Sequence, residues 1–348
     1  MKRKYSNNEI KKAGKILIDP NCYSAQEIEN AQHILTYWRT IHAYPINTFQ
    51  ATLRDKISRY SFKNALIAQR LKRSVSIVSK LKRFSNMKLS TMQDISGLRA
   101  ILKNIDEVRK LENSYRKSKF KHLLKDDKDY INDPADSGYR GIHLIYQYVN
   151  ENSPESNGLR IELQIRTKLQ HTWATAVETM GTFLDYSLKS SQGPEDWLNY
   201  FALVSAGFSL LESCEPHSKF KDKGAKEIYQ EILNETKRLD VSKKLRAFTV
   251  AAEHIVKSNT NSKYNLITLN VKKMSVSVKN YPARKLEQAN IDYTNIEKEI
   301  NNGAPLQAVL VSTSSIDSLR KAYPSYFLDT QEFLEKLNLI VGLLKKMK

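Results

Sequence analysis

Residues 158–178 read GLRIELQIRTKLQHTWATAVE, and the spacing of their apolar residues changes at Thr167. Before Thr167, apolar and polar residues alternate, which is the period of a β-strand. The predicted strand places Ile161, Leu163 and Ile165 on one face and Glu162, Gln164 and Arg166 on the other, open face. After Thr167 the apolar residues follow helical spacing, and the predicted buried stripe is Leu169, Trp173, Val177 and Met180. The stretch therefore predicts an α/β fold, and an ordinary amphipathic strand with solvated polar residues remains an alternative to a functional site.

The composition indicates a globular protein with a polyanionic partner. The chain has 348 residues, of which 41% are hydrophobic and 27% charged, enough for more than one domain. Its formal net charge is +19, which favours nucleic acid or polyphosphate as a ligand, although lysines on solvated faces also contribute. No apolar run approaches the ~18 residues that span a bilayer. We therefore expect a cytoplasmic protein without a membrane partner.

The pattern along the chain predicts two domains. Helical periodicity covers residues 5–55 and again 61–84, strand-like runs occupy 95–166, and helices return from 167 to 257. The small polar stretch SNTNS, residues 258–262, is the expected linker. We predict a larger domain over 1–257, with a mixed β-sheet flanked by helices, and a small α+β domain over 258–348. In the second unit, 265–281 reads as a strand pair, AVLVSTS as a further strand, and SIDSLRKA and QEFLEKLNLIVGLLKK as helices.

A second acidic residue precedes another apolar strand. In TMQDISGLRAIL, residues 91–102, Asp94 stands before the strand and Gly97 permits a close approach of the backbone. An aspartate in this position is often a cap or turn residue. Together with Glu162 it makes a pair of carboxylates that can hold Mg²⁺ on nucleotide phosphates, and one of them can serve as a base.

Basic residues are concentrated just ahead of Asp94. The segment RLKRSVSIVSKLKR, residues 70–83, places Arg70, Lys72, Arg73 and Lys80 where they could reach triphosphate oxygens. A solvated charged face is the alternative interpretation. No GxxxxGK[ST] sequence occurs in the chain, which excludes a P-loop fold.

A glycine-flanked tyrosine precedes the next strand. In DPADSGYRGIHLIYQY, residues 133–148, Gly138 and Gly141 enclose Tyr139 and Arg140, and we expect both side chains to be exposed. An exposed aromatic ring on a turn suits stacking on a nucleobase. The alternative is a tyrosine packed over its own turn.

Taken in order over about residues 60–185, these four segments resemble the synthetase domain of the RelA/SpoT homologue family. The resemblance implies a mixed sheet flanked by helices, and a reaction that moves the β,γ-pyrophosphate of ATP to the ribose 3′-hydroxyl of an acceptor. It implies that Asp94 ligates Mg²⁺, and that Glu162 helps to hold this ion and activates the acceptor hydroxyl.

The same resemblance implies roles for further residues of the chain. The positions that match the family's ATP-binding segment and the motif after the magnesium aspartate are Arg70, Lys72, Ser76, Lys80 and Arg99. The positions that match the acceptor side are Tyr139, which would stack on the acceptor's base, and Gln164, Arg166 and His171.

Two acceptors follow from the resemblance. Some small synthetases of the family use GDP or GTP and make (p)ppGpp, and the toxic branch modifies the 3′-CCA end of tRNA. The segment YRKSKFKHLLKDDK, residues 115–128, is rich in basic residues, among them Lys119, Lys121 and His122. Because a tRNA acceptor stem presents many phosphates, this segment favours tRNA. A solvated lysine-rich helix is the alternative.

The C-terminal part resembles the antitoxin domain of the CapRel group of fused toxin–antitoxin proteins. In AYPSYFLD, residues 322–329, Tyr323 and Tyr326 match a Tyr-x-x-Tyr motif that blocks the ATP site in that group. No cysteine follows Cys214, which agrees with a zinc-finger-like unit without metal ligands. The resemblance implies release by a phage protein, often of the capsid, and packing between terminal helices is the alternative for the tyrosines.

The sequence therefore predicts an autoinhibited synthetase that uses ATP and Mg²⁺ to pyrophosphorylate tRNA, inhibiting translation in anti-phage defence. A (p)ppGpp synthetase is the second hypothesis, and a catalytically inactive RNA-binding protein is the third. Both Asp94 and Glu162 are present, which counts against the third.

Overall fold

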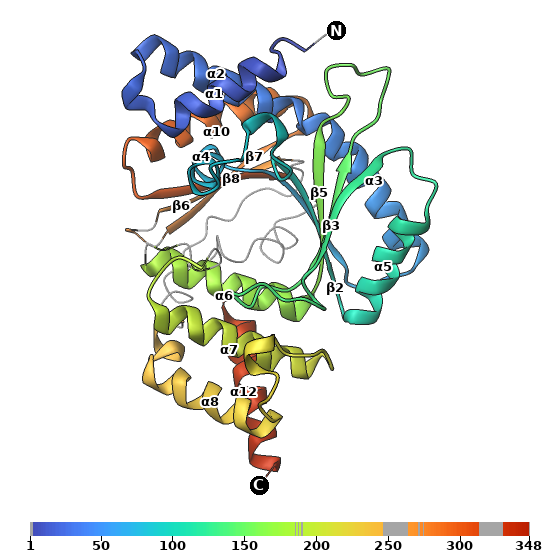
Figure 1. The fold of residues 1–348 in the computed structure, drawn as a ribbon, viewed down its shortest axis with the longest axis vertical. Coiled ribbons are helices and arrows are strands. Elements are labelled where there is room, and N and C mark those ends of the chain that lie inside the picture. Colours follow the sequence, from blue (N-terminus) through green and yellow to red (C-terminus); the bar gives the residue numbers. More distant parts are fainter. Residues whose placement is uncertain are drawn as a thin grey trace.

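The computed structural model describes residues 3–184, 186, 188, 191–245, 264–270, 272–273, 275–312 and 330–347. An eight-stranded sheet, in the order β3-β4-β5-β2-β1-β8-β6-β7, runs through the molecule (Figure 1). The strands are β1 Leu66–Leu71, β2 Ser96–Leu102, β3 Leu123–Asp129, β4 Ile142–Gln147, β5 Arg160–Thr167, β6 Tyr264–Asn270, β7 Ser275–Tyr281 and β8 Leu306–Ser312. The central strands β2 and β5 are parallel, and the other neighbouring pairs are antiparallel.

Helices cover the sheet in groups (Figure 1). The helices are α1 Asn7–Ile18, α2 Ala25–Ile41, α3 Ala43–Arg59, α4 Ser74–Arg83, α5 Ile105–Lys117, α6 Lys168–Leu184, α7 Glu195–Leu211, α8 Ala225–Arg238, α10 Leu286–Asn301 and α12 Gln331–Lys346. Short 3₁₀ turns occur at Pro20–Cys22, Leu89–Thr91, Ser218–Phe220 and Ala283–Lys285. The predicted class, a mixed sheet flanked by helices, is confirmed.

The apolar face of the central strands packs against α3 and α5. Ile161, Leu163 and Ile165 of β5 are fully buried in a cluster with residues of both helices, as the period-two pattern predicts. The opposite face of the same strands bears polar side chains, because alternate residues of a strand point to opposite sides. The helix stripe that follows Thr167 is also confirmed, since Trp173, Val177 and Met180 are buried in α6.

The first helices begin at well-defined caps. Ser6 and Glu9 form a capping box at α1, and Ser24 and Glu27 form a second one at α2. These motifs give hydrogen-bond partners to backbone amides that have none within the helix. Residues 5–55 fold as the helices that the periodicity predicts. In α2, Ala31, Leu35 and Trp38 are buried, and Ile28 is half-buried.

The helix predicted over residues 61–84 is wrong in its first half. Residues 66–71 form strand β1, which pairs with β2 on one side and β8 on the other, and only α4 is helical. A short apolar run does not distinguish a central strand from a helix, because pairing partners far along the chain decide between them. Within 115–128, the lysine-rich helix ends at Lys117 and the segment continues as the edge strand β3.

The C-terminal strands extend the sheet of the preceding part. β8 pairs with β1, β6 lies between β8 and β7, and α12 packs on α6 and α8. The predicted hairpin of 265–281, the strand that follows and the last helix are confirmed. The boundary at 258 and SIDSLRKA lie outside the described residues, and the two-domain division and the zinc-finger likeness stay predictions.

No helix in the described parts of the chain is long and apolar enough to cross a membrane.

Candidate active site

Three adjacent strands, β1, β2 and β5, bring Arg70, Arg99 and Glu162 to one face of the sheet. The register places Arg70 of β1 beside Gly97 of β2, and Gly97 beside Glu162 of β5. Because Gly97 has no side chain, no side chain stands between Arg70 and Glu162 in this cross-strand row of three residues. A Cβ atom built on Gly97 would lie 3.9 Å from Glu162 Oε2. Asp94 lies two residues before β2.

Asp94 is held by two lysines from the segment that precedes it. Its Oδ2 lies 2.9 Å from Nζ of Lys72 and 2.9 Å from Nζ of Lys80, and all three side chains are largely buried. Burial and the neighbouring Glu162 favour the protonated carboxyl, but Lys72 and Lys80 outweigh them and lower the pKa of Asp94. Burial lowers the pKa of Lys72. Asp94 is therefore an ionised carboxylate among cations.

Glu162 is held from two sides. His143 Nδ1 lies 3.0 Å from its Oε1, and Gln164 Nε2 donates to its Oε2 at 2.8 Å. Burial by itself would raise the pKa of Glu162, but His143, Gln164 and Lys72 together hold it well below its usual range. The three polar residues of β5 were expected on an open surface, which is wrong for Glu162 and Arg166. They are 9% and 1% exposed, because α6 and the neighbouring strands enclose this end of the sheet.

His143 is a site residue that the sequence analysis missed. It stands in β4, on the same face as Gln164, and its Nε2 lies 2.7 Å from the hydroxyl of Tyr139. Burial disfavours the imidazolium, but Tyr139 and Glu162 outweigh it and raise the pKa of His143 to about 9. The signal was present in the sequence, since any register that pairs the two strands in phase keeps His143 on the same face as Glu162 and Gln164.

The stability of the protein should therefore depend on pH through His143. A folded-state pKa above the ordinary value of 6.5 contributes stability that is complete below pH 6.5 and is lost as the pH rises through about 9. We expect wild type to be more stable than His143→Gln at pH 6, with the difference shrinking towards pH 9.5. Urea denaturation of both proteins over this range measures it, and a difference that stays constant with pH would contradict the assignment.

A group of arginines lies on the same face. Burial and the guanidinium groups of Arg99 and Arg70 lower the pKa of Arg166 to about 9. Arg166 Nη2 lies 2.5 Å from Nδ1 of His171 in α6. Its buried Nε and Nη1 have no hydrogen-bond partner among the described residues. Buried donors without partners are costly, and polyphosphate oxygens would satisfy them.

The residues present fit a magnesium ion bound together with phosphates. Asp94 Oδ1 is buried and has no hydrogen-bond partner within the described part of the chain. No group of three or more His, Cys, Asp or Glu side chains that could hold a metal occurs among the described residues. Mg²⁺ is usually held by one or two carboxylates, water and substrate phosphates, so Asp94 with Glu162 is a suitable ligand pair.

Ser76 and Lys80 stand four residues apart on α4, on one side of the helix. Lys80 reaches Asp94, and Ser76 is half-buried. The structure thus brings Asp94, Glu162, Lys72 and Lys80 together, and Ser76 stands on the helix that carries Lys80.

The turn that precedes β4 carries Tyr139, which was predicted to bind the acceptor, and its neighbour Arg140. Tyr139 and Arg140 are 7% and 4% exposed, so the expectation that both are exposed is wrong. Gly138 has a φ of 86°, and a Cβ there would lie 2.9 Å from that of Ser205, so the turn packs tightly on α7. Arg140 donates to the carbonyl oxygens of Ile131 and Glu215, which is a structural role. A stacking role for Tyr139 stays a prediction.

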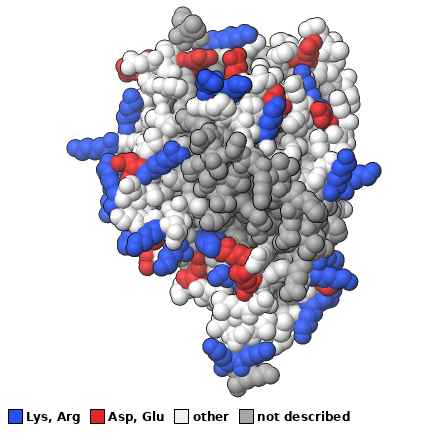
Figure 2. All heavy atoms as spheres, turned by 180° about the vertical axis from the view of Figure 1, so that it is seen from behind, with Lys and Arg blue, Asp and Glu red and all other residues white. Residues whose placement is uncertain are grey.

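The lysine-rich segment contributes exposed charge at the edge of the sheet. Lys119 and Lys121 are exposed just before β3. His122 is buried and stacks on Phe49 and Tyr148, and burial together with Lys121 lowers its pKa to about 4. It is therefore neutral and does not belong to the basic surface. On the face seen in Figure 2, Lys and Arg are spread among Asp and Glu rather than gathered in one patch.

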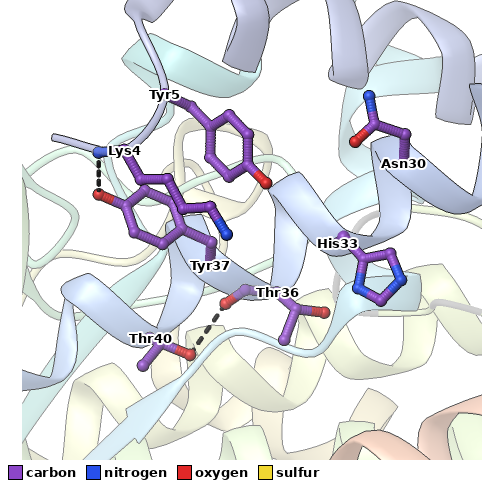
Figure 3. A pocket seen from close by; sticks show the side chains of 7 residues that line it. All are labelled: Lys4, Tyr5, Asn30, His33, Thr36, Tyr37 and Thr40. Carbon is purple, nitrogen blue, oxygen red and sulfur yellow. Dashed lines mark hydrogen bonds between the residues drawn. The ribbon is translucent and has the colours of Figure 1, made fainter.

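A cavity of about 410 Å³ lies beside α2, and none of its lining residues is a predicted site residue (Figure 3). They are Lys4, Tyr5, Asn30, His33, Thr36, Tyr37 and Thr40. Tyr323 and Tyr326 lie outside the described residues, and their predicted block of the ATP site remains a prediction.

Comparisons with known proteins agree with the site. Residues 69–183 match the family model described as a region found in RelA / SpoT proteins. GTP pyrophosphokinase YjbM of Bacillus subtilis is 33% identical over 112 residues, which are 31% of this chain and 52% of that protein. GTP pyrophosphokinase YwaC of the same organism is 31% identical over 112 residues, 30% of this chain and 52% of that protein. The chain thus spans about half the length of these curated relatives.

Solved structures include the small alarmone synthetase 1 from Bacillus subtilis bound to its product pppGpp, with 25% identity and a TM-score of 0.43. The match covers 49% of this chain and 89% of that one. Residues 69–183, the span that matches the family model, contain every catalytic, ATP-binding and acceptor-side residue predicted from the sequence.

Proposed function

We propose that this chain is a pyrophosphokinase of the RelA/SpoT type, which transfers the β,γ-pyrophosphate of ATP to a ribose 3′-hydroxyl. The observation that supports it most is the convergence of Asp94 and Glu162 with Lys72, Lys80 and Arg166 on one face of the sheet. Two carboxylates can hold a metal ion, and the surrounding cations can neutralise the phosphates of ATP. This is the equipment that phosphoryl-group transfer requires.

The residues of the site divide this work between them. Bound Mg²⁺, held by Asp94 and Glu162, would supply charge neutralisation at the phosphates. Lys72 and Lys80 would bind phosphate oxygens of ATP next to the ion. Arg166 would donate hydrogen bonds from its buried Nε and Nη1 to oxygens of the same triphosphate. His143 keeps Glu162 ionised and fixed in orientation. A carboxylate with so low a pKa is a weak base, which suits a reaction catalysed mainly by positioning and electrostatics.

We propose the 3′-CCA end of tRNA as the acceptor. The net charge of +19 and the exposed Lys119 and Lys121 support a ligand with many phosphates. Synthesis of (p)ppGpp from GTP or GDP is the second candidate, supported by the naming of two relatives as GTP pyrophosphokinases.

One assay separates these candidates. The purified Tyr326→Ala protein, in which the block of the ATP site predicted from the sequence is absent, is given ATP labelled at the γ-phosphate and Mg²⁺. The acceptor is either GTP, GDP, deacylated tRNA or tRNA whose 3′-terminal ribose has been oxidised with periodate. Label on intact but not on oxidised tRNA supports the first acceptor, and labelled guanosine polyphosphates support the second. Transfer to none of them, with a folded protein, would refute the pyrophosphokinase itself.

We further propose that the C-terminal segment restrains the enzyme until a phage protein, such as a major capsid protein, releases it. The proposal rests on the Tyr-x-x-Tyr sequence of 323–326 and on the resemblance that this sequence contributes to. A lid of this kind must be only a few kcal/mol more stable closed than open, so that a partner can shift the balance.

Tyr323→Ala or Tyr326→Ala should therefore release the enzyme without a partner. We expect induced expression of either variant to arrest growth and protein synthesis, while wild type is tolerated. The control adds Glu162→Gln to the same variant, which should restore growth. Variants that are folded, well expressed and harmless would show that the tyrosines do not restrain the enzyme.

A further inference from the structure

A buried ion pair joins the second helix of the chain to the C-terminal segment. Arg39 of α2 and Glu297 of α10 are each 5% exposed, and Nη1 lies 2.6 Å from Oε2. The guanidinium also lies 5.0 Å from the centre of the Tyr293 ring. Burial disfavours the charged guanidinium, but Glu297 and Tyr293 outweigh it and raise the pKa of Arg39. Both charges depend on each other, because a buried charge without its partner is strongly unfavourable.

Both members of this pair bind the turn between β1 and α4. Glu297 accepts hydrogen bonds from the backbone N–H of Ser74 at 2.8 Å and from its hydroxyl at 2.9 Å. Arg39 donates from Nε to the carbonyl oxygen of Lys72 at 3.0 Å, and from Nη1 to Ser74 Oγ at 2.7 Å. Residue 73, the N-cap position of α4, makes no side-chain capping bond. Glu297 therefore caps α4 from another part of the chain.

The same turn supports the proposed ATP site. Lys72, whose carbonyl oxygen Arg39 binds, reaches Asp94 with its side chain. The helix that Glu297 caps contains Ser76 and Lys80, and Lys80 also reaches Asp94. In Figure 1, α10 runs beside α4 on this side of the sheet, and the contacts between the two helices agree. Glu297 thus fixes the backbone of Ser74 directly and that of Lys72 through Arg39.

We propose that Glu297 and Arg39 are positioning residues for ATP binding, through which the C-terminal segment completes the donor site. This inference rests on the proposed pyrophosphokinase function. Glu297 of α10 holds the first turn of α4, and Arg39 of α2, its ion-pair partner, holds the backbone of Lys72 in the geometry that phosphate binding needs. The C-terminal segment then has a direct and favourable part in ATP binding, separate from any block by Tyr323 and Tyr326. Movement of α10 would weaken the site, because Ser74 would lose its cap and Arg39 its counter-charge.

The test compares two carboxylates of the same helix. Glu297→Gln keeps the shape and removes the charge that faces Arg39 and Ser74. Asp292→Asn is the matched control, because Asp292 binds Lys279, Tyr281 and Gln288 within the C-terminal segment. Ser74→Ala is a milder second variant, which removes only the hydroxyl from the network. All are made in the Tyr326→Ala background, in which the proposed block is absent.

Two quantities are measured on the full chain: binding of a non-hydrolysable ATP analogue by calorimetry, and steady-state transfer to the acceptor. We expect Glu297→Gln to weaken analogue binding and raise the KM for ATP about tenfold or more, and Ser74→Ala about threefold. The kcat at saturating ATP and the KM for the acceptor should change less than threefold. Asp292→Asn should match the background in every value.

Equal analogue affinity in the Glu297→Gln, Ser74→Ala and Asp292→Asn proteins would overturn the inference. A loss of the same size in Glu297→Gln and Asp292→Asn would overturn it as well, since it would show only general loosening of the segment. Failure of the underlying function is recognised separately, because the Tyr326→Ala background itself would then transfer no pyrophosphate to any acceptor.

Discussion

Glu162→Gln is expected to reduce pyrophosphoryl transfer about 10³-fold or more, while the protein stays folded. Glutamine has the same shape, and its oxygen can still accept a hydrogen bond from Gln164 or His143. It lacks the negative charge that would hold Mg²⁺ and orient the acceptor hydroxyl. It also removes a counter-charge that keeps His143 protonated, so the pKa of His143 falls.

The measurement is single-turnover transfer with labelled ATP, because it reports the chemical step without product release. All the proteins, including the reference with Glu162, carry Tyr326→Ala so that the proposed block is absent. A suitable control is Glu112→Gln, which removes another buried carboxylate that is ion-paired, with Arg109 and Arg116, on helix α5. This control loses stability without touching the polar face. A folded Glu162→Gln protein with transfer within tenfold of this reference would refute the assignment of Glu162.

Asp94→Asn should have a loss of similar size for a different reason. Its carboxylate is the centre on which Lys72 and Lys80 converge, and its Oδ1 is the buried oxygen with no partner among the described residues. Asparagine removes the charge that a magnesium ion needs and leaves two lysine ammonium groups near each other without their counter-charge. We expect about 10³-fold slower transfer, and a rate that rising Mg²⁺ restores only slightly.

The experiment titrates Mg²⁺ at fixed ATP for the Tyr326→Ala protein and for the same protein with Asp94→Asn or the control Asp126→Asn. Asp126 lies on the edge strand β3 and accepts a hydrogen bond from Gln93, whereas Lys72 and Lys80 pair with Asp94. If Asp94 is a metal ligand, only its variant shifts the Mg²⁺ dependence. Unchanged Mg²⁺ dependence in an active Asp94→Asn protein would remove Asp94 from the metal site.

Much of the catalytic face is predictable from the sequence because it depends on local periods. Alternation in 160–166 gave the two faces of β5, and helical spacing gave the buried stripe of α6. The clustering of basic residues just ahead of Asp94 predicted that Lys80 binds phosphate, which stays a prediction, and the contact of Lys80 with Asp94 came only from the structure. The predicted solvent exposure of two side chains on this face was wrong. Arg166 and Tyr139 have polar ends and were expected to be open, but packing from α6 and α7 encloses them.

The long-range pairings could not be predicted. Residues 66–71 contain no period that separates a strand from a helix, and their state depends on β2 and on β8, which begins at residue 306. His143 gains its charge only from Glu162 and Tyr139, which the fold brings within hydrogen-bonding distance. Helix α10 was not recognised at all, and the importance of Glu297 depends on Arg39 and Ser74, more than 200 positions away.

The sequence by itself determined which residue types stand on which face of β5 and α6, because side-chain direction follows from local backbone geometry. It also contained the ordered segments that resemble the RelA/SpoT synthetases. Only the tertiary structure decided which carboxylates are ionised, which cations lie beside them, and that α10 caps α4. These properties depend on burial and on distances between atoms that are remote in the chain, and a buried charge is stable only where the fold supplies its partner.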